Sequence, residues 1–549
     1  MLVKLLKILC LCFIGFYPVT TFFSQQHLIN EIDFKYSFWR EYQKTPISEV
    51  QNPKWNSDEN TIVGWDWSLP ETVTPSYKSN LCIARNFGLS KNKIELLTKI
   101  NFKANPVISH WVKWRELEPV EGKINFSPLI ENIKLANEKG YGSIIRIHFS
   151  ATDFAPDWIK KYNIPIRKEK KENPKKTNYE VSHPEFHKRY LTFITALGES
   201  KIPQMKEVRG LFLGYASPSN GDEGIGPYPE NLSEANDTIQ HVRERIDAWA
   251  KACKSAESKV FMGGLSNYGL SKGFGIRRGF VEMYLYHIPD EHIGQLLDKN
   301  NYLYVDESNE IIKKNVFHGE ENEEYEEKWA SSERNFRFGK TTKSFPYRYF
   351  TSNLRLLQMR TNYLLNNEFA LLPEMLTWVS LSLGKTIDDT PDAWCFLRES
   401  YLRKGSEKVK NFERWVYQRD TEGYETSAVE KINHPIKMWM VEPDLHFDYI
   451  ARKGKKIGFD VEDKFYQTNN KFAVKISYID VGNGNWSLVF QGKERVEKRK
   501  VSNENSGKMK TVTFFISPNF KDKTIPFDLE IHGENDFEPT ISFLRIIKV

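Results

Sequence analysis

The feature that most constrains the fold is an alternation of strand-like and helix-like segments from residue 61 to about residue 400. The helix-like segments keep apolar residues at helical spacing, as in Ser127–Gly140, Asn231–Lys254 and Leu354–Leu365. This alternation predicts an α/β fold in which about eight parallel strands form a (β/α)8 barrel. The strand-like runs are Thr61–Trp67, Pro106–Trp111, Ser143–Phe149, Gly210–Tyr215, Lys259–Gly264, Tyr302–Asp306 and Asn315–His318.

The sequence pattern changes beyond residue 440. Short alternating runs such as Ala473–Asp480 are separated by Asn/Gly turns, and this pattern predicts an antiparallel β-sandwich. The predicted organisation is a signal peptide over 1–24, an N-terminal lead-in over 25–60, the barrel over 61–402, a linker over 403–440 and the sandwich over 441–549.

The N-terminus predicts export. Lys4 and Lys7 precede a short apolar run that is interrupted by Pro18, which is typical of a secretory signal and too short for a membrane span. The predicted location is therefore secreted or periplasmic, without stable membrane insertion after processing; a lipoprotein anchor at Cys10 or Cys12 is the alternative. Without the two lysines the formal charge of +6 falls to +4, which is too mild to indicate a nucleic-acid partner.

Several kinds of chemistry lack support in the sequence. Cys82, Cys253 and Cys395 are too few and too scattered for a disulfide framework, and they are interpreted as buried thiols or at most one bridge. The Gly273–Phe280 segment lacks the spacing of a phosphate-binding glycine loop. No zinc-binding or serine-esterase motif occurs, so neither a metal nor a cofactor is predicted.

One segment, Trp111–Glu131, resembles the second-strand segment of clan A glycoside hydrolases. Trp111 ends a strand, Glu118-Pro119 and Glu121-Gly122 follow, and Phe126 introduces a helix. The resemblance covers residues 60–400 in organisation, but it is close only in this segment. It implies a barrel enzyme with a general acid/base glutamate at the end of the fourth strand and a nucleophilic glutamate at the end of the seventh.

The fourth and seventh strand-like runs each precede carboxylates. Glu223 follows Gly210–Tyr215 and is the predicted acid/base. The family pattern places Asn directly before this glutamate, whereas Asn220 precedes Glu223 by three residues, so Asp222 is the competing candidate. Glu321 follows Asn315–His318 and is the predicted nucleophile, with Glu320 and Glu324 as alternatives. The competing interpretation of the acidic run after residue 319 is a solvated helix face.

Polar and aromatic residues near the other strand ends and rim loops are candidate substrate contacts. Each has a structural alternative, because histidines at strand ends are often satisfied core groups and tryptophans are often buried packing rings. The candidates are His110, Trp111, Arg115, Arg146, His148, Asn220, Asp222, Asn267, Tyr268, Glu320, Trp378 and Trp394.

These observations favour a retaining glycosidase that acts on a polysaccharide. Arg115, Arg146, Arg277 and Arg278 lie near the predicted rim and favour a sulfated galactan or fucan, because guanidinium groups bind sulfate in bidentate fashion. Two alternatives stay open. A polysaccharide lyase would use Tyr215 or His148 as a base, and a non-catalytic glycan-binding protein would use the barrel only as a scaffold.

Overall fold

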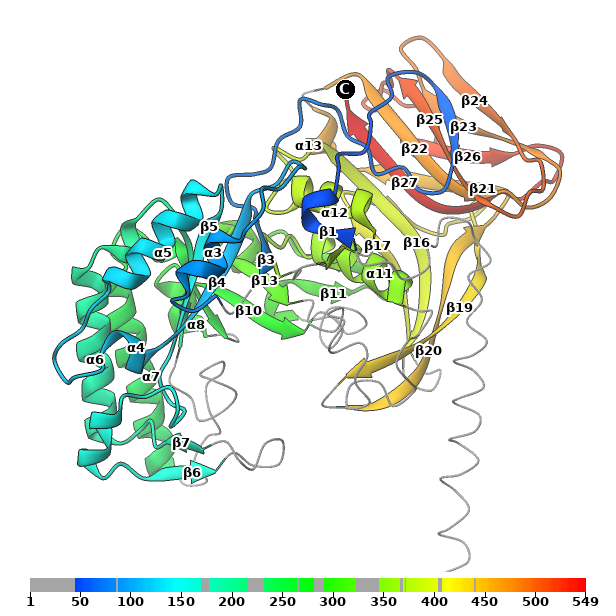
Figure 1. The fold of residues 1–549 in the computed structure, drawn as a ribbon. Coiled ribbons are helices and arrows are strands. Elements are labelled where there is room, and N and C mark those ends of the chain that lie inside the picture. Colours follow the sequence, from blue (N-terminus) through cyan, green and yellow to red (C-terminus); the bar gives the residue numbers. More distant parts are fainter. Residues whose placement is uncertain are drawn as a thin grey trace, which may run out of the picture.

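The computed structural model describes residues 45–549 apart from 85–86, 169–176, 215–231, 264–265, 281–290, 322–344, 366–368, 371, 403–406, 439–440 and 468. Eight parallel strands close into a barrel, and each pairs with the next one along the chain until the last pairs with the first (Figure 1). The (β/α)8 prediction is therefore confirmed. The strands are β3 (Asn80–Ala84), β4 (Pro106–Lys113), β5 (Gly142–His148), β8 (Val208–Leu213), β9 (Val260–Gly263), β10 (Gly275–Phe280), β13 (His318–Glu321) and β14 (Tyr363–Leu365).

The barrel helices begin and end at the residues that favour helix termini. In α6 (Pro184–Glu199), His183 caps the first turn by accepting a hydrogen bond from the Glu185 backbone, and proline occupies the first position. The predicted helices at 127–140 and 231–254 are α5 (Ser127–Glu138) and α7 (Leu232–Ala252). The predicted helix over 354–365 is only half right. α11 (Phe345–Gln358) ends before Arg360, whose φ of +63° is left-handed, and the chain then enters β14.

Two of the predicted barrel strands are wrong. Residues 61–67 contain β2 (Asn60–Val63), which pairs antiparallel with a C-terminal strand. Residues 302–306 contain β12 (Leu303–Val305), which pairs antiparallel with β11 (Gln295–Leu297). The first and sixth strands are instead β3 and β10, and the latter lies in the segment considered above for phosphate binding. The numbering of the fourth and seventh strands is unaffected, because one missed strand replaces each wrong one.

The C-terminal domain is a sandwich of two antiparallel sheets, as predicted, but it starts earlier than residue 441. The larger sheet has the order β17-β16-β20-β27-β22-β25-β2 with β19 beside β20, and the smaller has the order β18-β21-β26-β23-β24. The predicted linker over 403–440 is therefore wrong, since β17, β18 and β19 lie within it. The bounds are β16 (Asp392–Leu402), β17 (Glu407–Arg414), β18 (Val416–Gln418), β19 (Ser427–Met438), β20 (Val441–Lys453), β21 (Lys456–Val461), β22 (Phe472–Ile479), β23 (Asn485–Gln491), β24 (Val496–Ser502), β25 (Met509–Ile516), β26 (Leu529–Gly533) and β27 (Thr540–Lys548).

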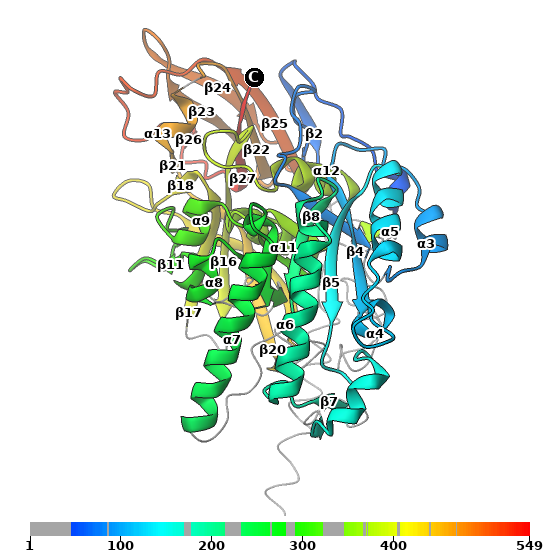
Figure 2. The ribbon, with the colours of Figure 1, turned by 90° about the vertical axis from the view of Figure 1, so that its left-hand side faces the viewer.

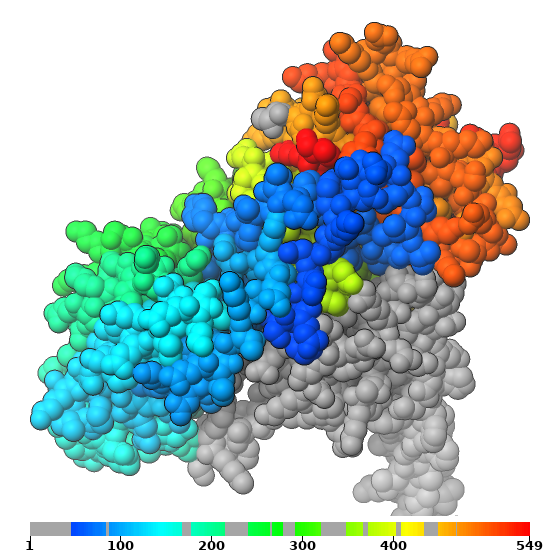
Figure 3. All heavy atoms as spheres, turned by 45° about the horizontal axis from the view of Figure 1, so that its top comes forward, coloured from blue at the N-terminus to red at the C-terminus, as the bar shows by residue number. Residues whose placement is uncertain are grey.

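The N-terminal part of the described chain joins the two domains. In Figure 3 this blue segment crosses from the barrel onto the orange and red strands of the sandwich. Trp67 stacks on Trp378 of α12 (Pro373–Ser382) with ring centroids 4.8 Å apart, and Trp65 lies 5.4 Å from Phe543 of β27. These tryptophans therefore join barrel and sandwich into one apolar core instead of forming the first barrel strand.

The strand directions place the two ends of the barrel. Figure 2 shows the sandwich above the barrel and the strand arrow of β5 pointing away from it. The short hairpin of β6 (Ile166–Lys168) and β7 (Thr177–Tyr179), which follows β5, therefore lies at the C-terminal end of the barrel. The β19–β20 hairpin extends from the sandwich down to the same level (Figure 1).

A salt bridge between the N-terminal segment and the sandwich predicts a dependence of stability on pH. Burial alone would raise the pKa of Asp66, but the Lys475 ammonium and the hydrogen bonds from Ser68 outweigh it and hold the pKa below its ordinary value. The ionised carboxylate therefore stabilises the fold above its ordinary pKa, and this contribution is lost as the pH falls through the folded-state pKa. Burial also lowers the pKa of Lys475, so the test belongs in the acid range, where the ammonium is protonated.

We expect Asp66→Asn to lower the free energy of unfolding by about 1–3 kcal/mol at pH 6, because Lys475 loses its buried partner. The difference between wild type and variant should shrink between pH 5 and pH 3 in denaturant titrations. A difference that stays constant over that range would contradict the assignment.

Candidate active site

The barrel interior on the side of the strand starts is filled by side chains from most of the barrel strands. Phe261 and Phe317 stack with ring centroids 4.1 Å apart, and Tyr363 lies 5.0 Å from Phe317. Together with Cys82, Val107, Ile144, Phe212 and Leu365 they form a separate buried cluster inside the barrel. Because this cluster closes the interior, any chemistry has to take place on its other side, at the C-terminal ends of the strands.

Three of the predicted contacts come together inside the barrel at the ends of the second and third strands. Trp111 has the same parity along β4 as Val107, which belongs to the interior cluster. The Arg146 guanidinium lies 4.2 Å from the centroid of the Trp111 ring, and the His148 ring lies 5.0 Å from it. Arg146 is 4% exposed and His148 is 3% exposed. A tryptophan, a buried cation and a histidine therefore share one wall of the barrel interior.

A second buried arginine lies, like the first, beside the Phe212 ring of the interior cluster. The Phe212 ring of β8 lies 4.5 Å from the Arg146 guanidinium and 5.8 Å from that of Arg277 in β10. Arg277 is 5% exposed. Buried guanidinium groups require anionic or strongly polar partners, so the two arginines make this part of the barrel interior polar. The alternation of strands and helices did not reveal β10, because its Arg277-Arg278 pair interrupts the apolar pattern.

The predicted nucleophile candidates end the seventh strand. β13 ends at Glu321, which pairs with Leu365 of β14 and with Phe280 of β10. Leu365 belongs to the interior cluster, whereas Leu364, the partner of Glu320, belongs to the core outside the barrel. Since neighbours across parallel strands share a face, the register favours position 321 over position 320 for the barrel interior.

The predicted acid/base lies outside the described residues. β8 is confirmed as the fourth strand and ends at Leu213, and Gly214 follows it. Tyr190 of α6 donates a hydrogen bond to the carbonyl of Gly214, and the Trp249 indole donates to the Tyr190 hydroxyl at 2.7 Å. Asn220, Asp222 and Glu223 follow in 215–231, as does Tyr215, and Glu324 lies in 322–344, so the structure places none of them.

The segment that resembles the clan A motif fixes the end of the second strand. Glu118 accepts hydrogen bonds from the Trp114 indole at 2.7 Å and from the Gly122 backbone at 2.9 Å, and its carbonyl accepts from Trp158 at 2.9 Å. Burial raises the pKa of Glu118. Gly122 has a φ of +72°, which a residue with a side chain rarely adopts. The motif therefore acts structurally, by holding the chain just beyond Trp111.

Two of the predicted contacts at these strand ends make contacts within the protein. His110 has the parity of Ile108 and Val112 and faces the outer core, where its Nε2 lies 3.0 Å from Ser143 Oγ. Burial lowers the pKa of His110 to about 4, so it is a neutral core histidine. Arg115 donates to the Ala155 carbonyl through Nε and Nη2, both at 2.9 Å, and so anchors the loop after β5.

The contacts predicted after the fifth strand and near the eighth also lie elsewhere. Asn267 and Tyr268 begin α8 (Asn267–Ser271), and the Tyr268 hydroxyl donates to Asp247 of α7 at 2.8 Å, in the outer helical layer. Trp378 and Trp394 are fully buried with ring centroids 5.9 Å apart, at the junction of barrel and sandwich. The packing alternative holds for both tryptophans, because neither ring has a face open to a sugar.

Other features of the described residues bear on the kind of site. Cys82, Cys253 and Cys395 are buried and form no disulfide bond with one another, as expected from their scattering. Within the described ranges, no group of three or more His, Cys, Asp or Glu side chains is arranged to hold a metal ion. No helix in that part of the chain is long and apolar enough to cross a bilayer.

Comparisons with known proteins give structural neighbours but no sequence relatives. The sequence matches no family model, and no curated protein matches it. The fold is similar to the catalytic domain of a β-amylase from Paenibacillus polymyxa, at 8% identity and a TM-score of 0.35 over 56% of this chain and 98% of that one. It is also similar to a family 30 xylanase from Clostridium acetobutylicum, at 9% identity and a TM-score of 0.31 over 87% and 98% of the two chains.

A family 30 endoxylanase from Clostridium papyrosolvens gives nearly the same values, 9% identity and a TM-score of 0.31 over 88% of this chain and 99% of that one. Similarities this distant do not extend to the chemistry, because one barrel architecture supports many unrelated reactions. The function of this chain therefore has to be argued from its own site.

Proposed function

We propose that this protein is a secreted glycoside hydrolase that cleaves a polysaccharide with retention of the anomeric configuration. The observation that carries the proposal is the register of β13, which ends the seventh barrel strand at Glu321 beside the sixth strand that holds Arg277. The fourth strand leads directly into the segment that contains Glu223. Carboxylates at the ends of these two strands are the pair that the clan A resemblance implies.

Each residue then has a distinct role. Glu321 attacks the anomeric carbon and forms a covalent glycosyl ester, for which it must be ionised. Glu223 protonates the leaving oxygen and then deprotonates the attacking water, with Asp222 as the alternative. A retaining pair of this kind stands about 5–5.5 Å apart. Trp111 offers its half-buried ring to a sugar face beside His148.

We infer that the substrate is a polysaccharide, and a sulfated galactan or fucan is the first candidate. Guanidinium groups bind sulfate as well as carboxylate, and Arg146 and Arg277 lie in the barrel interior, whereas Arg115 is committed to backbone carbonyls. The test is incubation of the purified protein with a panel of sulfated, uronate-containing and neutral polysaccharides. The hydrolase proposal requires new reducing ends without unsaturated products. Unsaturated uronates would instead identify a lyase, for which His148 is a candidate catalytic base. Binding without cleavage would identify a glycan-binding protein.

We expect Glu223→Gln to lower kcat by about 100- to 10,000-fold on substrates with poor leaving groups, because the amide cannot donate a proton. On an activated aryl glycoside, whose leaving group needs little protonation, the loss should be much smaller. Steady-state rates on both substrates check the prediction, with Glu310→Gln, which removes an exposed carboxylate paired with Lys314, as the control. Near-normal rates on both would transfer the role to Asp222.

A further inference from the structure

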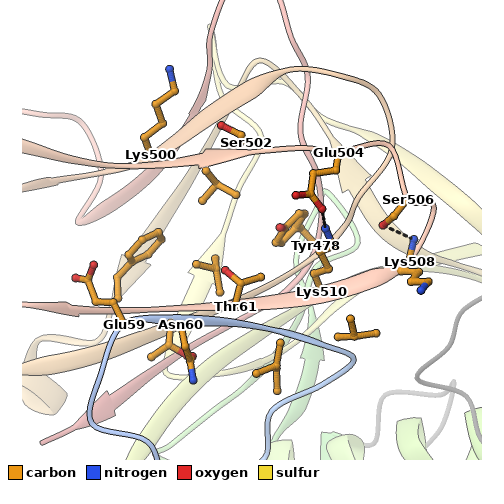
Figure 4. Close-up of a pocket in the computed structure, with 16 residues that line it drawn as sticks. Glu59, Asn60, Thr61, Tyr478, Lys500, Ser502, Glu504, Ser506, Lys508 and Lys510 are labelled. Carbon is orange, nitrogen blue, oxygen red and sulfur yellow. Dashed lines mark hydrogen bonds and ion pairs between the residues drawn. The ribbon is translucent and has the colours of Figure 1, made fainter.

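Two of the cavities that lie away from the candidate active site differ in their charge balance. One, of about 670 Å³, lies on the open side of the sandwich between β2, β24 and β25 (Figure 4). Two of the three lysines that line it are paired with carboxylates. Lys510 lies 2.8 Å from Asp480 and 2.7 Å from Glu504, and Lys500 lies 2.9 Å from Glu534. This cavity therefore has little excess charge with which to attract a ligand.

The other cavity, of about 660 Å³, lies at the N-terminal end of the barrel and is called here the mouth cavity. Lys78, Lys206, Arg209 and Lys259 line it, and Glu207 is the one carboxylate among its described lining residues. The four cations come from the starts of β8, of its neighbour β9 and of β3 on another side of the barrel, so three strand starts bring positive charge to one opening. Phe317 of the interior cluster also lines the cavity. The interior cluster therefore separates the mouth cavity from the candidate active site at the far end of the barrel.

The cations of the mouth cavity are held by neutral groups. The Lys78 ammonium donates to the Asn315 carbonyl at 3.0 Å, and the Lys259 ammonium donates to the Met205 carbonyl at 2.8 Å. Arg209 donates to the Tyr77 carbonyl at 3.3 Å. None of the four lies within ion-pair distance of a carboxylate of the described residues, although Glu207 attracts Lys259 and Asp389 attracts Lys78 from further away. The hydrogen bonds of Lys78, Arg209 and Lys259 fix the positions of these three cations without placing a carboxylate against them.

This arrangement costs stability. Burial lowers the pKa of Lys259, and the positive charge of Arg209 lowers it further, which is the sign of like-charge repulsion. Burial also lowers the pKa of Lys78. The N-terminal end of a (β/α)8 barrel ordinarily serves stability. Unfavourable charge at this end is therefore explained by a ligand of opposite charge, since departures from local consistency are expected at functional sites.

The cavity also carries an aromatic ring that fits a sugar. Tyr77 is 79% exposed at the cavity edge, and the Lys78 ammonium lies 5.9 Å from its ring centroid. The backbone N–H groups at the strand starts are used inside the barrel, as in the bonds from Asn80 to Asn362 and from Ser143 to Glu207. Recognition therefore falls to cations on separate strands together with an exposed ring. This combination suits a chain of sugars with several separate anionic groups better than a single phosphate held by a backbone loop.

We propose that the mouth cavity is a second glycan-binding site, which takes an oligosaccharide carrying sulfate or carboxylate groups. Lys78, Lys206, Arg209 and Lys259 bind the anionic groups, and Tyr77 packs against a sugar ring. The site lies at the opposite end of the barrel from Glu321, so binding there does not depend on the proposed hydrolase activity. It would hold the protein on a charged polysaccharide while the far end of the barrel stays accessible.

The first test is lysine footprinting of the wild-type protein. The protein is acetylated under limiting reagent with and without a sulfated galactan hexasaccharide, and the rate at each lysine is measured by mass spectrometry. We expect Lys206 to react at least fivefold more slowly with the sugar, while Lys201 and Lys251, which lie beside carboxylates in the groove between α6 and α7, react at unchanged rates. An unsulfated galactan hexasaccharide is the control ligand. Equal protection by this neutral sugar, or no protection at Lys206, would overturn the proposal.

Calorimetric titration of variants gives an independent test. The double variant Lys206→Ala/Arg209→Ala should bind the sulfated hexasaccharide at least tenfold more weakly, and the control double variant Lys201→Ala/Lys251→Ala should bind it as the wild type does. Tyr77→Ala should weaken binding of the hexasaccharide but not of inorganic sulfate. An oligogalacturonide in parallel titrations shows whether carboxylate or sulfate is preferred. Equal losses of affinity in the two double variants would show that the sugar is held by non-specific charge attraction, and would overturn the proposed site.

Discussion

Replacing Glu321 by glutamine is expected to lower turnover of the polysaccharide identified by the panel by about a thousandfold or more, because an amide cannot form the glycosyl ester. The variant should remain folded, as judged by circular dichroism and by its melting curve. Glu320→Gln should retain most of the activity, because the register pairs Glu320 with Leu364 on the outside of the barrel.

A matched control lies in the same strand–helix unit. Glu310 of α9 (Glu310–Lys314) forms an exposed ion pair with Lys314, and Glu310→Gln should leave turnover unchanged. Loss of activity in Glu320→Gln together with normal activity in Glu321→Gln would show that the register does not select the nucleophile. Normal activity in both variants would remove the seventh strand from the mechanism.

The second large effect concerns the junction of barrel and sandwich. Asp392 of β16 is fully buried and accepts hydrogen bonds from the Trp378 indole at 2.7 Å and from Arg545 Nη2 of β27 at 2.8 Å. We expect Asp392→Ala to lower the free energy of unfolding by about 3–5 kcal/mol, because the Arg545 charge stays buried without its partner. Denaturant titration followed by tryptophan fluorescence measures the change.

Asp388→Ala is the control for this variant, because Asp388 is an exposed residue four positions away and its loss should change stability by no more than about 0.5 kcal/mol. A loss below about 1 kcal/mol for Asp392→Ala would mean that the domains are held together by their apolar contacts alone. Those contacts include the Trp67–Trp378 stack, so the two contributions can be separated by combining the variants.

The sequence predicted the barrel because most of its strands are apolar and are followed by helices with a clear apolar stripe. It failed where that signal is weak. β14 has three residues and β3 has five, which is too short for a recognisable period, and β10 carries two arginines within six residues. The Thr61–Trp67 run resembles a barrel strand because its tryptophans pack in the core, but the strand with which it pairs, β25, lies about 450 residues further along the chain.

The candidate site was predicted in part for related reasons. Position along a strand was enough to place Trp111, Arg146 and His148 near one another, because alternate residues face the same side. The same alternation turns His110, which is one residue away from Trp111, to the opposite side of the strand. The burial of Trp378 and Trp394 depends on a sheet formed by residues more than 100 positions further on, and no local pattern reports such a contact.

The central claim is that the chain is a retaining glycosidase, and the most direct measurement is proton NMR of the first product released from the polysaccharide that the panel identifies. The account predicts that the new reducing end appears first in the anomeric configuration of the cleaved bond and only later mutarotates, because a covalent intermediate at Glu321 inverts the centre twice. A first product of the opposite configuration would contradict the account even though hydrolysis had occurred. It would mean that the two carboxyl groups admit a water molecule between them and stand about 6.5–9.5 Å apart.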